Sequence, residues 1–127
     1  MRRMAAAVMA PVLIGTAAAA AAGDPARGEA IATSRSLGLC TLCHALPGQP
    51  PALQGNLGPP LAGIGARLDA QALRARLLTP ERFNPDTLMP AYGRSEGLQR
   101  VAAAQRGRPL LTPAQIDDVV AYLAGLR

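Results

Sequence analysis

The stretch Cys40-Thr41-Leu42-Cys43-His44 decides how the rest of the chain is interpreted. It separates two thiols by two residues and puts a histidine directly after the second thiol. This spacing is typical of a covalent haem attachment site, where the thiols add across the porphyrin vinyl groups and the adjacent histidine binds the iron from one face. We therefore predict one covalently bound haem c, attached through Cys40 and Cys43 and ligated by His44.

Three other kinds of site share part of this pattern. A thioredoxin-like redox pair has the same cysteine spacing, but it needs a strand-to-helix context and has no reason to carry His44. A structural zinc site needs four ligands, and two cysteines with one histidine cannot supply them. A disulfide between Cys40 and Cys43 stays open, because exported proteins often form such bonds.

The second axial ligand of the iron cannot be another histidine of this chain, because His44 is the only one. Three of the four methionines lie within the first nine residues, which we expect to be removed, so Met89 is the sole methionine of the mature chain. Pro85 and Pro90 flank it and limit where its thioether can point. Methionine is more often a core residue, but a His/Met pair is a common haem c arrangement. We predict that Met89 is the second iron ligand.

The first residues indicate export. Arg2 and Arg3 precede an apolar stretch at residues 5–14, and the alanine-rich run at 17–22 offers small residues to signal peptidase. We predict that residues 1–22 are a cleaved signal peptide, and that residues 23–127 form one periplasmic domain with no membrane attachment. An uncleaved anchor is the alternative, although alanine is only weakly apolar.

Composition excludes some functions and suggests a buried cofactor. Without Arg2 and Arg3, 11 arginines stand against 8 acidic residues, a net charge of +3. The chain has no lysine and little aromatic content, so nothing resembles a nucleic-acid footprint. Phe83, Tyr92 and Tyr122 are its only aromatic residues, and a porphyrin would supply the bulky apolar surface that they leave missing.

Local signals predict short helices and no strands. Asp24-Pro25 is typical of a helix start and predicts a helix to about residue 34. Asp69 predicts a helix at 70–78 that ends before Pro80. Thr112-Pro113-Ala114-Gln115 is a capping box that opens a terminal helix with one apolar face. The prolines and glycines of residues 47–60 indicate a stiff loop without regular structure. We expect an all-α fold of short helices and proline-rich loops, wrapped around the haem.

These features together resemble the class I cytochrome c family over the whole mature chain. The matching features are Gly28 in the first helix, the CxxCH stretch, GPPLAGIGAR at 58–67, Met89-Pro90 and a last helix with VAYL at 120–123.

The resemblance implies several contacts. Gly28 would let Tyr122 cross it closely, and the Pro59 carbonyl would hold the ring N–H of His44. Leu61 would pack on the porphyrin, and Arg67 would contact a propionate. Two positions depart from the family pattern: Ala32 stands where a large aromatic is frequent, and Ala66 replaces a usual glycine.

A narrower resemblance is to SoxX, the family of small cytochrome subunits of the sulfur-oxidising system. It rests on GNLGP at 55–59, NPDTLMPAY at 84–92, GLxRVA at 97–102 and RPLLT at 108–112. It implies a heterodimer with a SoxA-type cytochrome, in which thiosulfate is joined to a cysteine of the SoxYZ carrier. This chain would accept the electrons, pass them to a downstream cytochrome c or oxidase, and have no catalytic activity alone.

Two alternatives stay open: a free electron shuttle, and a haem sensor in which a ligand displaces Met89. For the complex, we expect partner contacts from residues 45–57 and 84–92, which flank the exposed haem edge in the class I arrangement. The segment 97–111 would add Arg100, Arg106 and Arg108, which can pair with acidic groups or stay solvated.

Overall fold

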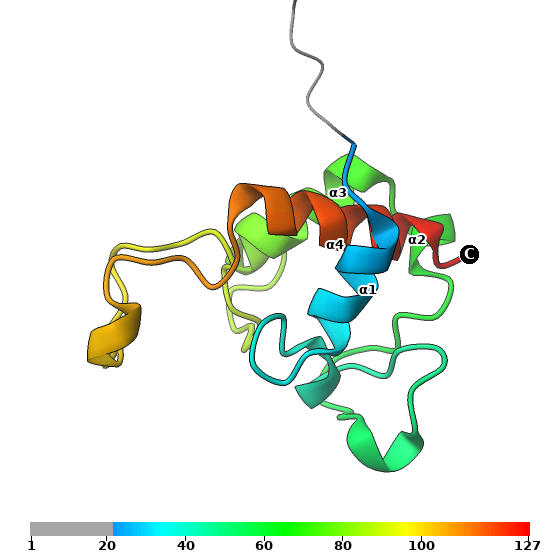
Figure 1. Cartoon of the computed structure of the whole chain (residues 1–127), viewed down its shortest axis with the longest axis horizontal. Helices are drawn as coiled ribbons and strands as arrows, with labels where there is room; N and C mark the ends of the chain where they lie inside the picture. The colour runs from blue at the N-terminus through cyan, green and yellow to red at the C-terminus, as the bar shows by residue number, and fades with distance from the viewer. Residues whose placement is uncertain (1–21) are drawn as a thin grey trace, which may run out of the picture.

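The computed structural model describes residues 22–127, and its regular elements there are all helical (Figure 1). The α-helices are α1 (Pro25–Thr33), α2 (Ile64–Arg67), α3 (Ala70–Leu78) and α4 (Pro113–Gly125). Short 3-10 turns cover Cys40–Leu42, Pro51–Leu53, Pro80–Arg82 and Ala103–Gln105. The predicted all-α fold is confirmed. The predicted signal peptide lies outside the described residues, apart from its last residue, and stays a prediction.

The three predicted helix starts are present with their caps. The Asp24 carboxylate accepts hydrogen bonds from the N–H groups of Ala26 and Arg27, at 2.8 and 3.1 Å. Asp69 accepts from the N–H of Ala72 at 2.8 Å, and Thr112 opens a complete capping box. Each such cap contributes about 1 kcal/mol, because it satisfies an N–H group that has no partner inside the helix.

The sequence missed the shortest elements. The structure has a 3-10 turn at Pro51–Leu53, inside the segment predicted to lack regular structure, and the four-residue helix α2 was not predicted. Elements of three or four residues are too short to show a hydrophobic period, so no sequence pattern predicts them.

Helices α1 and α4 cross at Gly28 (Figure 1). A Cβ atom at this position would lie 2.0 Å from the carbonyl oxygen of Asp118 and 2.8 Å from the Cβ of Tyr122. The close approach of Gly28 and Tyr122 is therefore present, and only a residue without a side chain fits between the two helices.

Gly28→Ala is expected to lower the free energy of unfolding by about 3 kcal/mol or more. The added methyl group meets backbone atoms, which cannot move aside without separating the helices. Gly125→Ala is the matched control, because a Cβ at that helical glycine has no neighbour within 4 Å. Denaturant unfolding of both holoproteins measures the difference. Equal midpoints would contradict the tight crossing.

An ion pair between the exposed Arg27 and the buried Asp118 reinforces this crossing. Asp118 is only 6% exposed, and its carboxylate accepts from the Asp24 N–H at 2.7 Å and from Arg27 Nε at 2.9 Å. The hydrogen bond from Arg27 lowers the pKa of Asp118 below its usual value. The start of α1 is thus fixed to the middle of α4 by charge as well as by packing.

The two departures from the family pattern have clear places in the fold. Ala32 is completely buried in the core. Helix α2 approaches the end of α4 through Gly65, where a Cβ would lie 2.2 Å from the Ala124 carbonyl oxygen, whereas Ala66 is exposed. An alanine at position 66 therefore does not obstruct this contact.

Within residues 22–127, no helix is both long and apolar enough to cross a membrane.

Candidate functional site

The two cysteines lie on one tight turn. Leu39 has a φ of 59°, and the following turn carries hydrogen bonds from the N–H groups of Cys43 and His44 to the Cys40 carbonyl, at 3.1 and 2.8 Å. Cys40 is the first residue of this 3-10 turn and Cys43 is its C-cap, so the two thiols lie at the two ends of one turn. Both thiols are free, and burial raises the pKa of Cys40.

His44 is held in one orientation by the segment that contains Pro59, as the family resemblance implies. Its Nδ1 lies 2.7 Å from the carbonyl oxygen of Pro59. Because a carbonyl can only accept, Nδ1 carries the proton and Nε2 presents its lone pair. The ring is therefore prepared to bind a metal through Nε2.

Backbone pairing brings the Pro59 segment to His44. The Gly58 N–H donates to the Cys43 carbonyl at 2.7 Å, and the Leu61 N–H donates to the Ala45 carbonyl at 2.9 Å. A Cβ at Gly58 would lie 2.3 Å from Cε1 and 2.6 Å from Nδ1 of the imidazole. No role for Gly58 itself was predicted from the sequence. The glycine before Pro59 is the only signal of this contact in the sequence.

Gly58→Ala is expected to push the imidazole away from Pro59 and weaken the Nδ1 hydrogen bond. That bond makes the imidazole a better donor and so favours the oxidised metal. The reduction potential of the holoprotein should rise by on the order of 59 mV, which is a tenfold change in a one-electron equilibrium. Potentiometric titration measures it against Gly125→Ala. A potential equal to that of the control would contradict this role of Gly58.

Leu61 and Arg67 lie on the same segment. Leu61 is partly buried and packs against the hydrophobic core. The exposed Arg67 guanidinium donates to the carbonyl oxygens of Ala62 at 3.0 Å and Pro60 at 3.3 Å. Arg67 thus stabilises the loop that carries the Pro59 carbonyl, and the predicted contact with a propionate stays a prediction.

The Met89 segment is held by hydrogen bonds at Met89 and at Tyr92. The N–H of Met89 donates to Thr87 Oγ1 at 3.1 Å, and the N–H of Tyr92 donates to the Leu77 carbonyl at 2.9 Å. Met89 is partly buried and packs against the core, and it also lines a hollow of about 260 Å³. Leu88 next to it is 83% exposed.

Tyr92 connects this segment to the cysteine turn, a role that the sequence did not reveal. Its hydroxyl donates to the Gly38 carbonyl at 2.6 Å and lies 4.0 Å from Cys40 Sγ. Burial raises the pKa of Tyr92 far above its usual value, so the hydroxyl remains a donor. The segments on the two sides of the predicted iron site are therefore joined through a buried hydrogen bond.

Gln54 gives the loop after His44 its shape. Its side-chain oxygen accepts from the Leu46 N–H, and its amide nitrogen donates to the Gln49 carbonyl at 2.6 Å. No role for Gln54 was predicted from the sequence, because only the folded loop brings its side chain to these partners.

The residues present fit a covalently attached haem. Two free thiols lie at the ends of one turn, His44 offers Nε2, and a partly buried thioether lies on a segment that is hydrogen-bonded to the same region. A thioether and a neutral imidazole are the ligands typical of such an iron.

Comparison with known proteins agrees with this geometry. The model of the family described as "Cytochrome c" matches residues 25–127, so the chain belongs to the cytochrome c family, whose members hold haem c covalently. Among solved structures, the chain is similar to one in "Crystal structure of SoxXA from P. pantotrophus". Sequence identity is 34%, the match covers 84% of this chain and 83% of that one, and the TM-score is 0.70. The chain is accordingly a SoxX-type electron-transfer cytochrome. A search of curated proteins finds no match.

Proposed function

We propose that this chain is the electron-accepting subunit of a SoxAX-type complex in the periplasm, formed after removal of residues 1–22. The observation that carries the proposal is the 34% identity to a chain of SoxXA, which extends over more than four fifths of both chains. In such a complex the chain would accept electrons as thiosulfate is joined to a cysteine of the SoxYZ carrier, and would have no catalytic activity alone.

Seven residues would hold the cofactor. Cys40 and Cys43 attach one haem c, while His44 and Met89 ligate its iron. Pro59 orients His44, Leu61 would pack on the porphyrin, and Arg67 would contact a propionate. When bound in this way, the haem supplies a one-electron Fe(III)/Fe(II) couple.

The protein residues favour electron transfer over substrate binding. The Pro59 carbonyl holds His44 in one tautomer, and the hydrogen bonds at Thr87 and Tyr92 keep the Met89 segment in place. If His44 and Met89 both ligate the iron, a substrate would have no free position on it unless Met89 left. The arrangement therefore favours a carrier that gives and takes electrons across its surface.

The proposed reaction balances with a one-electron acceptor. A cysteine thiolate of the carrier and thiosulfate form one sulfur–sulfur bond and release two electrons, and no atom is lost. This chain would then be reduced twice for each bond formed and would pass each electron to a downstream cytochrome c or oxidase.

Exposed apolar side chains support a partner surface on the two loops predicted for it. Leu53 and Leu57 are 53% and 74% exposed on the first loop, and Leu88 is 83% exposed on the second. Proline residues restrict both loops before binding, which reduces the entropy lost on association.

The test is to co-express the chain with a SoxA-type cytochrome and purify the complex. With thiosulfate and the SoxYZ carrier present, the haem of this chain should become reduced. Omission of the carrier is the control. If the cytochrome runs as a monomer beside its partner and stays oxidised, the free electron shuttle replaces this function. Rapid binding of carbon monoxide to the reduced protein would instead favour the haem sensor.

A further inference from the structure

One segment extends away from the rest of the fold. Residues 93–110, which we call the arm, form the yellow-to-orange segment that projects from the helices in Figure 1. The two ends of the arm lie side by side, because the Leu111 N–H donates to the Tyr92 carbonyl at 3.0 Å. Tyr92 and Leu111 are 4% and 1% exposed, so the base of the arm is anchored in the core.

Beyond its base, where Gly93 lies against Leu78, the arm adds no buried residue to the core. Over residues 93–110, all of which the structure describes, no residue is buried. Its backbone hydrogen bonds join residues three apart, such as Gln105 to Ala102 at 2.8 Å, and none crosses between its two limbs. An excursion of this size costs conformational entropy, which packing within this chain does not offset.

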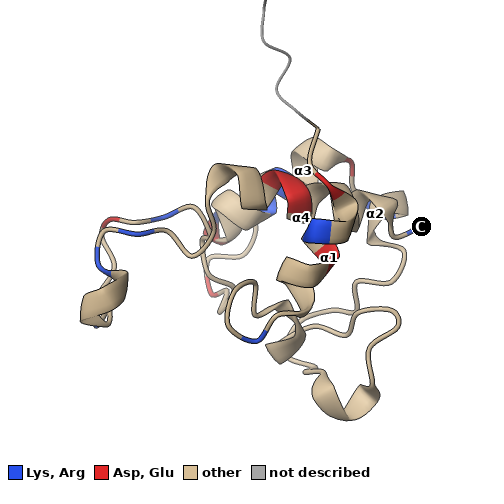
Figure 2. Cartoon of the chain, viewed as in Figure 1, with Lys and Arg blue, Asp and Glu red and all other residues tan. Residues whose placement is uncertain are grey.

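The net charge of the described chain lies entirely in the arm (Figure 2). Four arginines stand there against a single acidic residue, Glu96, which gives +3. The rest of residues 22–127 has seven arginines and seven acidic residues. Arg94 pairs with Glu81 at the base. For Arg100, Arg106 and Arg108, the described residues provide no ion pair.

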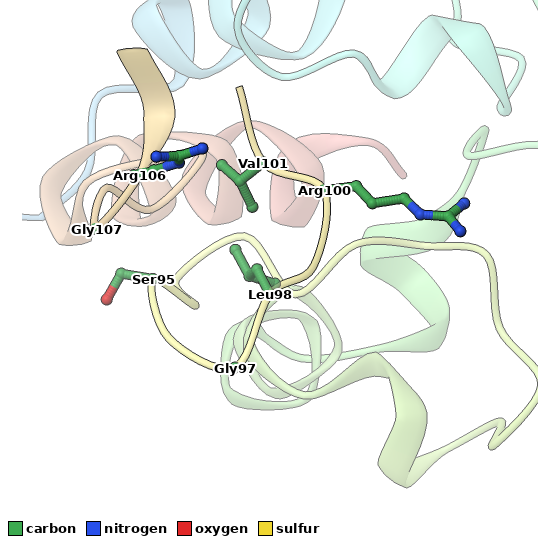
Figure 3. A pocket seen from close by; sticks show the side chains of 7 residues that line it. All are labelled: Ser95, Gly97, Leu98, Arg100, Val101, Arg106 and Gly107. Carbon is green, nitrogen blue, oxygen red and sulfur yellow. The ribbon is translucent and has the colours of Figure 1, made fainter. Parts of the chain in front are cut away.

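A hollow of mixed polar and apolar lining accompanies these charges. It measures about 290 Å³ and lies between the limbs of the arm. Figure 3 shows Leu98 and Val101 pointing toward each other across it, with Arg106 beside Val101 and Arg100 directed outward. Leu98 is 46% exposed. The surface thus combines two apolar side chains, Leu98 and Val101, with guanidinium groups that have no ion pair in this part of the chain. Arginine is enriched at protein interfaces.

We propose that the arm is a binding element for an acidic surface of the partner cytochrome. This rests on the function proposed above. Carboxylates of the partner pair with Arg100 and Arg106, and an apolar side chain enters the hollow between Leu98 and Val101. A protein is the occupant that these features favour over a nucleic acid, because residues 93–110 contain no aromatic side chain on which a base could stack.

Concentrating the charge in a projecting element has a kinetic consequence. Opposite charges steer association and set its salt dependence, and the neutral remainder of the chain contributes no such attraction. The arm should therefore control how fast and how tightly the partners meet, and leave the electron-transfer centre unchanged.

The test compares two variants of the holoprotein with equal charge changes. Arg100→Glu/Arg106→Glu reverses two charges at the hollow, and Arg35→Glu/Arg127→Glu reverses two charges outside the arm. Calorimetry with the purified SoxA-type cytochrome should show about tenfold weaker binding or more for the arm variant at low salt, with little change in the control. Glu96→Gln removes the carboxylate of the arm and should tighten binding.

Two further measurements make the outcome decisive. The reduction potential and the unfolding midpoint of each variant should equal those of the wild type, which shows that the fold and the haem site are intact. If the arm variant binds with the wild-type affinity and salt dependence, or if the control loses as much affinity, the arm proposal is wrong. If the wild-type holoprotein does not bind the partner at all, the proposed function fails as well.

Discussion

Met89→Ala in the holoprotein should abolish the sulfur-to-iron charge-transfer absorption of the ferric state and lower the reduction potential. The physical reason is the loss of a soft thioether ligand that favours ferrous iron. Axial ligands set haem potentials over about 0.8 V, so a change on the order of 0.1 V or more is expected. The vacated position should also bind added imidazole or cyanide. Optical spectra and potentiometry measure all three effects.

Leu88→Ala is the matched control for this experiment. Leu88 precedes Met89 on the same segment but is 83% exposed, so its loss should leave the spectrum and the potential unchanged. The hydrogen bonds of Thr87 and Tyr92 are untouched in both variants. A Met89→Ala protein with the wild-type ferric spectrum would show that another group ligates the iron.

Replacing both Cys40 and Cys43 with alanine should abolish covalent attachment completely. No other thiol exists in the chain to form a thioether. When the holoprotein is denatured in acid and extracted with organic solvent, the colour should stay with the wild-type polypeptide and leave the double variant. Extraction of colour from the wild type would reject covalent attachment.

The single cysteine variants should differ in stability. Cys40 is only 8% exposed and its thiol lies 4.0 Å from the Tyr92 hydroxyl, whereas Cys43 is partly exposed. Cys40→Ala therefore removes buried contacts as well as one thioether, and its unfolding midpoint should be the lower of the two. Each single variant should retain colour through its remaining thioether.

Much of this protein could be predicted from neighbouring residues in the chain. The starts at Asp24, Asp69 and Thr112 were predicted correctly, because a helix cap is made by residues two or three positions apart. The attachment stretch at 40–44 was recognisable for the same reason. Helix α2 and the turn at Pro51–Leu53 were not predicted, because elements of three or four residues are too short for a hydrophobic period to repeat.

The family resemblance extended the prediction to two long-range contacts, Gly28 with Tyr122 and Pro59 with His44. Both are present. For Arg67 the structure adds a local role, since its guanidinium binds the carbonyls of Pro60 and Ala62. The haem contacts of all these residues remain predictions.

The sequence by itself determined the helix starts and their order along the chain, because a helix start depends on adjacent residues. It also left one candidate for each iron ligand, because the mature chain has one histidine and one methionine. The tertiary structure decided which distant groups meet. It placed the Tyr92 hydroxyl on Gly38, Gly58 under the His44 ring, and Gly65 against α4. It also separated a neutral body from an arm that carries the net charge. Such contacts join residues tens of positions apart, and only the packing of the folded chain brings them within a few ångströms.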